Sequence, residues 1–115
     1  MSTERYARIV NDFAHDMATG TWAAGLLVIW TLSRRLADIP EEAATALADA
    51  MSLVFWLAVG ALAVIFATGG IRLRYWRRET APADLAAKRR SLLVKHAAFL
   101  VIYGSGTWWM WTMLP

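Results

Sequence analysis

Three long stretches of the chain carry no Asp, Glu, Lys or Arg, and each approaches the length needed to cross a lipid bilayer. They comprise residues 17–33, 50–71 and 96–115. Spanning the hydrocarbon core takes about 20 mostly apolar residues, within a range of about 17–25. The pattern predicts an all-α membrane protein, a single domain over residues 1–115, with three transmembrane helices near 13–34, 48–71 and 93–114.

Local signals predict where the helices begin and end around these stretches. The segment 40–42, Pro-Glu-Glu, is typical of a helix start, because Pro is tolerated in the first turn and acids suit the positive end of the helix dipole. We therefore expect the second helix to begin near residue 41. The Thr, Pro and Asp within 80–84 predict the start of the third helix, ahead of the bilayer. Gly69 and Gly70 predict an end or a loosening of the second helix.

The basic residues are distributed unevenly around the predicted spans. The N-terminal flank and the second loop hold ten of them, and the first loop holds two, Arg34 and Arg35. Lys and Arg are retained in the cytoplasm during insertion, so we expect a cytoplasmic N-terminus and a C-terminus on the outer side. The net charge of +3 is explained by this topology signal, which we favour over binding to nucleic acid.

The composition excludes several classes of protein. Hydrophobic residues make up 58% of the chain, and there is no cysteine. A disulfide scaffold, a Cys-ligated metal site and thiol catalysis are therefore ruled out. No Walker A loop, dinucleotide-binding glycine motif or Gly-x-Ser-x-Gly is present, so nothing supports nucleotide chemistry or hydrolysis. The first apolar stretch follows a mixed-charge segment and lacks an Ala-x-Ala site, so we expect it to be retained.

The chain has two histidines, His15 and His96, and the predicted topology brings them to one depth. The first and third helices run in parallel, so each histidine enters the membrane from the cytoplasmic side, about one turn deep. Ionisable residues within membrane spans are rare and tend to mark functional sites. Two imidazoles on different helices can coordinate a haem iron from both faces of the ring. The alternative is a pair of polar flanks anchored among the lipid headgroups.

The helix faces around the histidines supply the remaining candidate residues. Asp12 or Asp16 is placed to orient the His15 ring, as carboxylates do for metal-bound histidines. Basic residues next to the site are candidates to pair with haem propionates. The cofactor-binding residues expected around His15 and His96 are Trp22, Gly25, Phe99, Tyr103, Arg89, Arg90 and Lys95.

The segment 15–26 has the pattern His, six residues, Trp, two residues, Gly-Leu. It resembles the first haem-side helix of the copper-resistance protein D superfamily, and a similar helix occurs in HemJ-type protoporphyrinogen oxidases. The segment 92–100, with Lys95 before His96, looks like a Lys-led helix of the same superfamily. The resemblance implies a small polytopic protein with b-type haem, associated with copper uptake, haem biosynthesis or membrane electron transfer. It matches the family's histidine, tryptophan and glycine to His15, Trp22 and Gly25.

Three functions remain open at this point. The first is a b-type cytochrome of the bacterial inner (plasma) membrane, with His15 and His96 as axial ligands of haem b and possible exchange of electrons with quinone. The second is a copper-handling protein with His15, Met17, Met110 and Met113 as ligands. The third is a non-catalytic membrane subunit or assembly partner. Three helices cover a haem poorly, so we also expect a homodimer or a larger membrane complex, with contacts at Gly20, Ala24, Gly25, Gly60 and Gly104.

Overall fold

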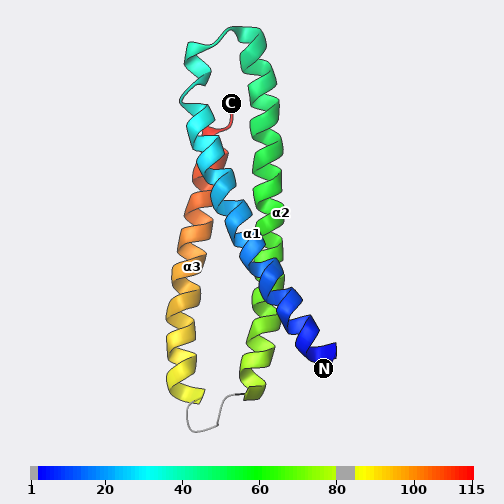
Figure 1. The fold of residues 1–115 in the computed structure, drawn as a ribbon. Helices are drawn as coiled ribbons and strands as arrows, with labels where there is room; N and C mark the ends of the chain where they lie inside the picture. Colours follow the sequence, from blue (N-terminus) through cyan, green and yellow to red (C-terminus); the bar gives the residue numbers. More distant parts are fainter. Residues whose placement is uncertain (1–2, 80–84) are drawn as a thin grey trace.

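The computed structural model describes residues 3–79 and 85–115, and this part of the chain is almost entirely helical. The elements in order are α1 (Thr3–Ser33), the short 3-10 helix η1 (Leu36–Asp38), α2 (Glu41–Glu79) and α3 (Leu85–Met113), as Figure 1 shows. The predicted all-α fold is therefore confirmed for the described residues. Each predicted span coincides, to within one residue, with part of one of the three long helices.

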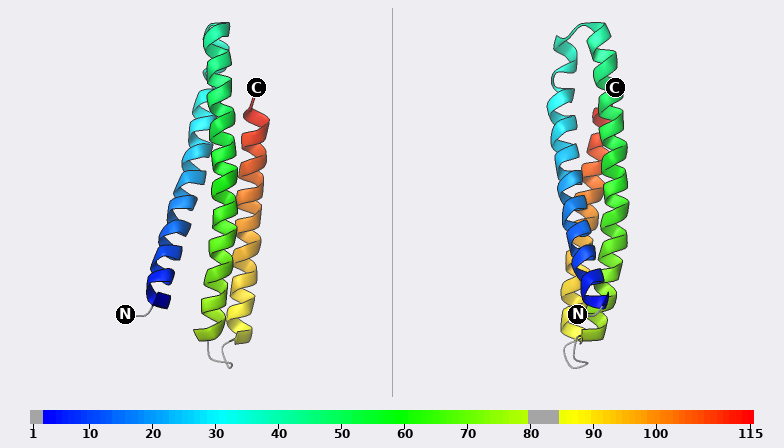
Figure 2. Two further views of the ribbon diagram at one scale, coloured as in Figure 1. Left: turned by 90° about the vertical axis from the view of Figure 1, so that its right-hand side faces the viewer. Right: turned by 45° about the vertical axis from the view of Figure 1, so that its right-hand side comes forward.

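The three long helices form an elongated bundle. α1 and α3 run in the same direction and α2 runs against both (Figure 1). The Cα atoms extend over 62 × 33 × 14 Å, so the bundle is little more than one layer of helices thick. Figure 2 shows that the axes of the antiparallel helices α2 and α3 are closely aligned and that the N-terminal end of α1 leans away from them.

The predicted helix boundaries are partly right. α2 begins at Glu41, as expected, and the Ala44 amide donates to the Pro40 carbonyl at 2.9 Å in its first turn. The predicted end near Gly69 and Gly70 is wrong, because α2 continues to Glu79. A glycine costs a helix only about 1 kcal/mol relative to alanine, which is less than the loss of helical hydrogen bonds at a break. The predicted start of the third helix, within 80–84, lies outside the described residues.

α1 and α2 pack closely along a seam of small and apolar residues. A Cβ placed on Gly25 would lie 3.2 Å from the Ala58 Cβ, which shows how near the two helices come. Buried positions on α2 recur every three or four residues, as helix packing requires. Small side chains at such a seam let backbones approach, which is where packing energy is gained in lipid. The buried apolar residues of the bundle are Ala18, Trp22, Ile29, Met51, Phe55, Ala58, Ala61, Ile65 and Met110.

Trp22 connects α1 to α3. Its indole N–H donates to the Thr107 hydroxyl at 3.1 Å, and its ring meets the edge of Tyr103 with centroids 4.8 Å apart. A Cβ added to Gly106 would lie 2.6 Å from the indole ring, so only glycine leaves room for the tryptophan. Toward its N-terminal end α3 packs less closely, since most residues from 86 to 102 are exposed.

Within the described residues, one helix is long and apolar enough to cross a membrane by length and composition. It is the Glu41–Arg74 part of α2, whose apolar window has a mean hydropathy of 2.4. The apolar stretches of α1 and α3 contain Trp, Thr and Gly, which lower their mean hydropathy.

Candidate functional site

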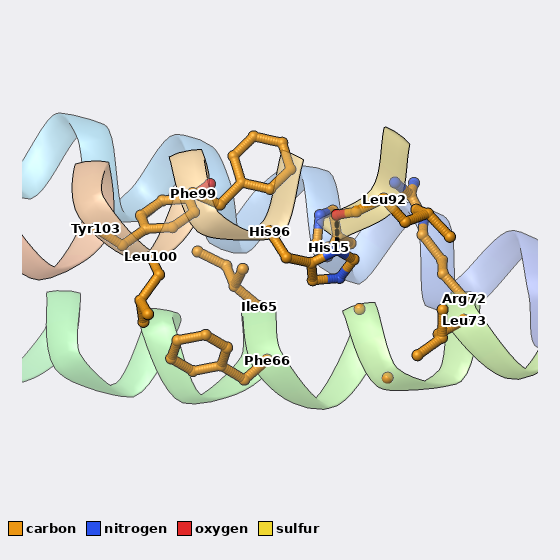
Figure 3. A pocket seen from close by; sticks show the side chains of 12 residues that line it. His15, Ile65, Phe66, Arg72, Leu73, Leu92, His96, Phe99, Leu100 and Tyr103 are labelled. Atoms are coloured by element: carbon orange, nitrogen blue, oxygen red, sulfur yellow. Dashed lines mark hydrogen bonds between the residues drawn. The ribbon is translucent and has the colours of Figure 1, made fainter. Parts of the chain in front are cut away.

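A cavity of about 600 Å³ lies between α2 and α3, with one wall formed by α1 (Figure 3). This volume is within the range of about 300–1,000 Å³ that is usual for small-molecule and cofactor sites. The lining is mostly hydrophobic and comes from all three long helices. It consists of His15 from α1, Ile65, Phe66, Gly69, Gly70, Arg72 and Leu73 from α2, and Leu92, His96, Phe99, Leu100 and Tyr103 from α3.

The glycine pair of α2 explains why there is open space at this level. Gly69 and Gly70 provide no side chain to fill the space between the helices. A Cβ on Gly69 would have one neighbour within 4 Å, the His15 Cε1 at 3.9 Å, and a Cβ on Gly70 would have none. The histidine ring therefore lies beside bare backbone, and a flat group can approach α2 closely.

The His15 ring is held by a hydroxyl from α2. Its Nδ1 lies 2.7 Å from the Thr68 Oγ1, and that hydroxyl also lies 2.7 Å from the Val64 carbonyl oxygen and 3.2 Å from the Ile65 carbonyl oxygen. When the hydroxyl donates to one of these carbonyls, its oxygen accepts from the imidazole, and Nδ1 then carries the proton in the neutral ring. Asn11 supports the same turn of α2 by donating its side-chain amide to the Thr68 carbonyl at 3.1 Å. This arrangement leaves Nε2 of His15 with a lone pair.

The His96 ring is held by its own helix. Its Nδ1 lies 2.6 Å from the Leu92 carbonyl oxygen, one turn earlier in α3. A carbonyl only accepts hydrogen bonds, so Nδ1 of His96 is the donor and Nε2 has the lone pair in the neutral ring. Both contacts are compatible with the tautomer in which Nε2 is the free ligand atom, and for His96 the carbonyl acceptor requires it. A fixed Nδ1–H is the usual outer contact of a metal-bound imidazole, because it sets the tautomer and raises the ligand's basicity.

Arg72 brings a positive charge to one end of the cavity. Its Nε donates to the Asp12 Oδ1 at 2.8 Å, and its Nη2 lies 3.7 Å from the Asp16 Oδ1. Asp12 and Asp16 are one turn apart on α1, so both carboxylates reach the same guanidinium. The predicted pairing of these aspartates with the His15 ring is replaced by two contacts: Thr68 orients the histidine, and the aspartates bind Arg72.

The structure separates the predicted cofactor-binding residues into two groups. His15, His96, Phe99 and Tyr103 all line the cavity. Trp22 and Gly25 do not line it, and each has a packing role. Trp22 joins α1 to α3 through Thr107, and Gly25 lies against Ala58 on α2. Trp22 nevertheless contacts the site indirectly, since its ring packs against Tyr103.

The predicted basic residues of α3 lie outside the cavity. Arg89, Arg90 and Lys95 are all exposed, and the lining does not include them. Arg89 precedes Leu92 by one turn and therefore points along the same stripe of α3, beyond the end of the cavity. Arg90 lies on another face of α3, and Lys95, three residues after Leu92 and four before Phe99, lies at the margin of that stripe. Among the described residues of the lining, the cation is Arg72 on α2.

Thr68 and Arg72 were missed in the sequence, although a signal for both was present. Thr68 is a polar residue inside an apolar stretch, and Arg72 is the first charge after it, four residues later on the same helical face. α2 runs antiparallel to α1 and α3, so its C-terminal turns lie at the same level of the bundle as the two histidines. Counting depth along the second helix as well as the first and third would have singled out these two residues.

The donor set fits a haem, which needs two axial ligands on opposite sides of a flat apolar space. His15 and His96 supply two imidazole rings beside apolar walls, and Arg72 supplies a guanidinium in the same lining. The described residues contain no cluster of three or more His, Cys, Asp or Glu side chains able to hold a metal ion.

The methionines considered as copper ligands lie in different surroundings. Met110 is completely buried in the core, and the Met113 sulfur accepts a 3.5 Å hydrogen bond from Ser33. Met17 is on α1 near His15, with its side chain 56% exposed. None of the three lines the cavity.

Comparisons with protein-family models, with curated proteins and with solved structures find no significant match to the chain.

Proposed function

We propose that this protein is a b-type cytochrome of the membrane, with His15 and His96 as axial ligands of one haem. One observation carries the proposal. Two histidines from separate helices line a single apolar cavity, and each has its Nδ1 within hydrogen-bond distance of an oxygen, Thr68 Oγ1 for His15 and the Leu92 carbonyl for His96. The resemblance of the segment 15–26 to the copper-resistance protein D superfamily supports the same cofactor.

Three membrane spans form part of this proposal. Only 28% of the apolar window of α2 is buried inside the protein, which is low for the core helix of a soluble domain. Exposed large hydrophobic residues are present on all three long helices, as lipid contact would require. The charge asymmetry favours a cytoplasmic N-terminus, which would place the cavity near the cytoplasmic face of the bacterial inner membrane.

The topology can be tested directly because the chain contains no cysteine. Single cysteines introduced at Ala37, in η1, and at Ala86, in the first turn of α3, are both at exposed positions. A membrane-impermeant maleimide added to intact cells is expected to label Ala37→Cys alone. Ala86→Cys is expected to react only after the membrane is opened. Labelling of both in intact cells would contradict the orientation.

The chemistry assigned to the protein residues follows from their contacts. A bound haem supplies one-electron transfer, and a membrane quinone is the candidate redox partner. His15 and His96 would hold the iron through Nε2. Thr68 and the Leu92 carbonyl hold the two rings, and the apolar walls of the cavity would contact the hydrophobic faces of the macrocycle.

Assembly with a second copy completes the proposed site. Several lining residues are widely exposed in the single chain: Phe66 is 57% exposed, Phe99 50% and Leu100 64%. A haem in this cavity would therefore have one side uncovered, and a homodimer would cover it. A Cβ added to Gly20, Gly60 or Gly104 would have no atom within 4 Å, so these glycines offer places for close approach. Both ligands line one cavity of one chain, so mixing His15→Ala with His96→Ala chains is expected to restore no haem binding.

The test is haem retention by the purified protein after expression with sufficient haem. The wild-type chain is expected to copurify with one haem per protomer, and His15→Ala and His96→Ala to lose most of it. Met17→Ala on α1 and Val94→Ala on α3 are matched controls, because both side chains are exposed and neither lines the cavity.

Glycine variants separate loss of a ligand from loss of folding. His15→Gly and His96→Gly are expected to regain haem when imidazole is supplied, since free imidazole can occupy the space of the missing ring. Full haem retention by the double variant His15→Ala, His96→Ala would contradict the proposal. Bound copper without haem in the wild-type protein would favour the copper-handling alternative instead.

A further inference from the structure

Arg72 is the only arginine or lysine among the described residues that line the cavity, and it lies at one end of it (Figure 3). Tyr103 and Leu100 lie toward the other end, with the two histidines between. We propose that Arg72 binds a carboxylate of the bound ligand, a haem propionate, and so fixes the orientation of the haem in the cavity. This inference rests on the proposed function. It adds the residue that determines toward which end of the cavity the propionate edge of the haem points.

The guanidinium has donors to spare for such a carboxylate. An arginine carries five N–H groups, and the aspartates engage it through Nε and one Nη2 edge. Its Nη1 group makes no hydrogen bond or ion pair with the described residues. The Arg72 side chain is 43% exposed, so a ligand in the cavity can reach it from the open side.

The present partners of Arg72 are suited to exchange. The contact with Asp16 is long, at 3.7 Å, and the Asp16 side chain is 75% exposed, so this carboxylate can return to water at little cost. Asp12 holds Nε at 2.8 Å and keeps the guanidinium beside α1. A ligand carboxylate would take the place of Asp16 on the Nη edge. The two oxygens of the ligand carboxylate would then accept from two N–H groups of the guanidinium, as in other arginine–carboxylate pairs.

The apolar end of the cavity makes the opposite orientation unfavourable. Ile65, Phe66 and Leu100 line that part of the wall and would leave a carboxylate without a charged partner. Arg72 lies seven residues before the end of α2 at Glu79, and α2 ends close to where α3 begins (Figure 1), on the side where water is accessible in the proposed three-span topology. Charge and solvent access therefore favour the same edge.

The test compares the binding of haem with that of haem dimethyl ester, in which both propionates are masked. Wild-type apoprotein in detergent is expected to prefer the free acid, and Arg72→Gln to lose that preference by about ten- to a hundredfold. Arg72→Lys is expected to keep part of it. Arg74→Gln is the matched control, because Arg74 is exposed on the same helix and does not line the cavity. The ester partitions differently into detergent, so the measured quantity is the ratio of the two dissociation constants in each variant.

The outcomes separate this inference from the proposed function. Equal ratios in the wild-type and Arg72→Gln proteins would overturn the role of Arg72 while leaving a haem protein intact. Failure of both ligands to bind wild-type protein would overturn the proposed function itself. Unchanged ester binding by Arg72→Gln shows that this variant is folded. Asp16→Asn removes the competing carboxylate and is expected to raise the affinity for the free acid several-fold, with no change for the ester.

Discussion

Replacing Thr68 by valine removes the hydroxyl that holds the His15 ring and preserves most of the side-chain volume. Thr68 is buried, with 8% of its surface exposed, and its Oγ1 is 2.7 Å from Nδ1 of His15. Without it, the imidazole N–H loses its acceptor in an apolar surrounding, at a cost of about 1–3 kcal/mol. The Val64 carbonyl, which also accepts from Thr68, keeps its helical amide partner. The penalty therefore falls mainly on His15.

The expected result in Thr68→Val is a lower haem affinity and a shifted midpoint potential. Loss of an outer contact to a ligand histidine typically weakens metal binding by about 10–100-fold, and we expect a fall in haem affinity of that size in Thr68→Val. Thr68→Ser retains the hydroxyl and is expected to restore the affinity. The midpoint potential should shift in the valine variant alone, because the Nδ1–H bond affects how strongly the imidazole donates to the iron.

The tautomer can be measured without haem. The chain has two histidines, so ¹⁵N NMR of histidine-labelled apoprotein gives two pairs of ring nitrogens, which the single histidine variants assign. Wild type is expected to show Nδ1 protonated and Nε2 free in the neutral His15 ring, and Thr68→Val a mixture. Thr107→Val is a matched control, because Thr107 also has a side-chain partner, Trp22, and neither residue lines the cavity. An unchanged His15 tautomer together with unchanged haem affinity in Thr68→Val would refute the reasoning.

Three further substitutions test the packing that supports the site. Gly106→Val is expected to displace Trp22, whose ring would lie 2.6 Å from the new Cβ. Overpacking of this kind lowers the free energy of unfolding by about 1–3 kcal/mol, which is measured as a lower thermal midpoint in detergent. An unchanged midpoint would contradict this contact. Gly25→Leu is expected to force α1 from α2 and to lower the thermal midpoint, because a Cβ at this position would lie 3.2 Å from the Ala58 Cβ; an unchanged midpoint would contradict the close seam. Asn11→Ala removes the 3.1 Å bond to the Thr68 carbonyl and is expected to cost about 0.5–1.5 kcal/mol of stability in the same melting experiment, and no loss would show the bond to be dispensable.

The sequence was sufficient to predict which residues of different helices lie at the same level of the bundle, because that level follows from counting residues along each helix. His15 and His96 were placed at one level from the order of spans and charges, and the structure places both on one cavity. Phe99 and Tyr103 follow His96 at helical spacing and share its stripe on α3, so they were found in the same way.

Rotation of each helix about its own axis could not be predicted in this way. Arg89, Arg90 and Lys95 were close to the site in sequence, and yet the charge that lines the cavity is on α2. The rotation of α2 is set by its seam with α1, where Gly25 meets Ala58, and this turns Thr68 and Arg72 toward His15 and the aspartates. Gly69 and Gly70 stay helical because the residues before and after them are held against α1. Thr68 contacts His15, and Arg72 binds Asp12.

Electron paramagnetic resonance of the purified, haem-loaded chain tests the central claim most directly. With both axial positions filled by His15 and His96, the oxidised wild-type protein is expected to give a low-spin signal, and each single variant, His15→Ala or His96→Ala, a high-spin one. The exposed-position controls Met17→Ala and Val94→Ala should remain low-spin. A high-spin wild-type protein, or a low-spin signal that survives in both histidine variants, would contradict a haem held between these two residues.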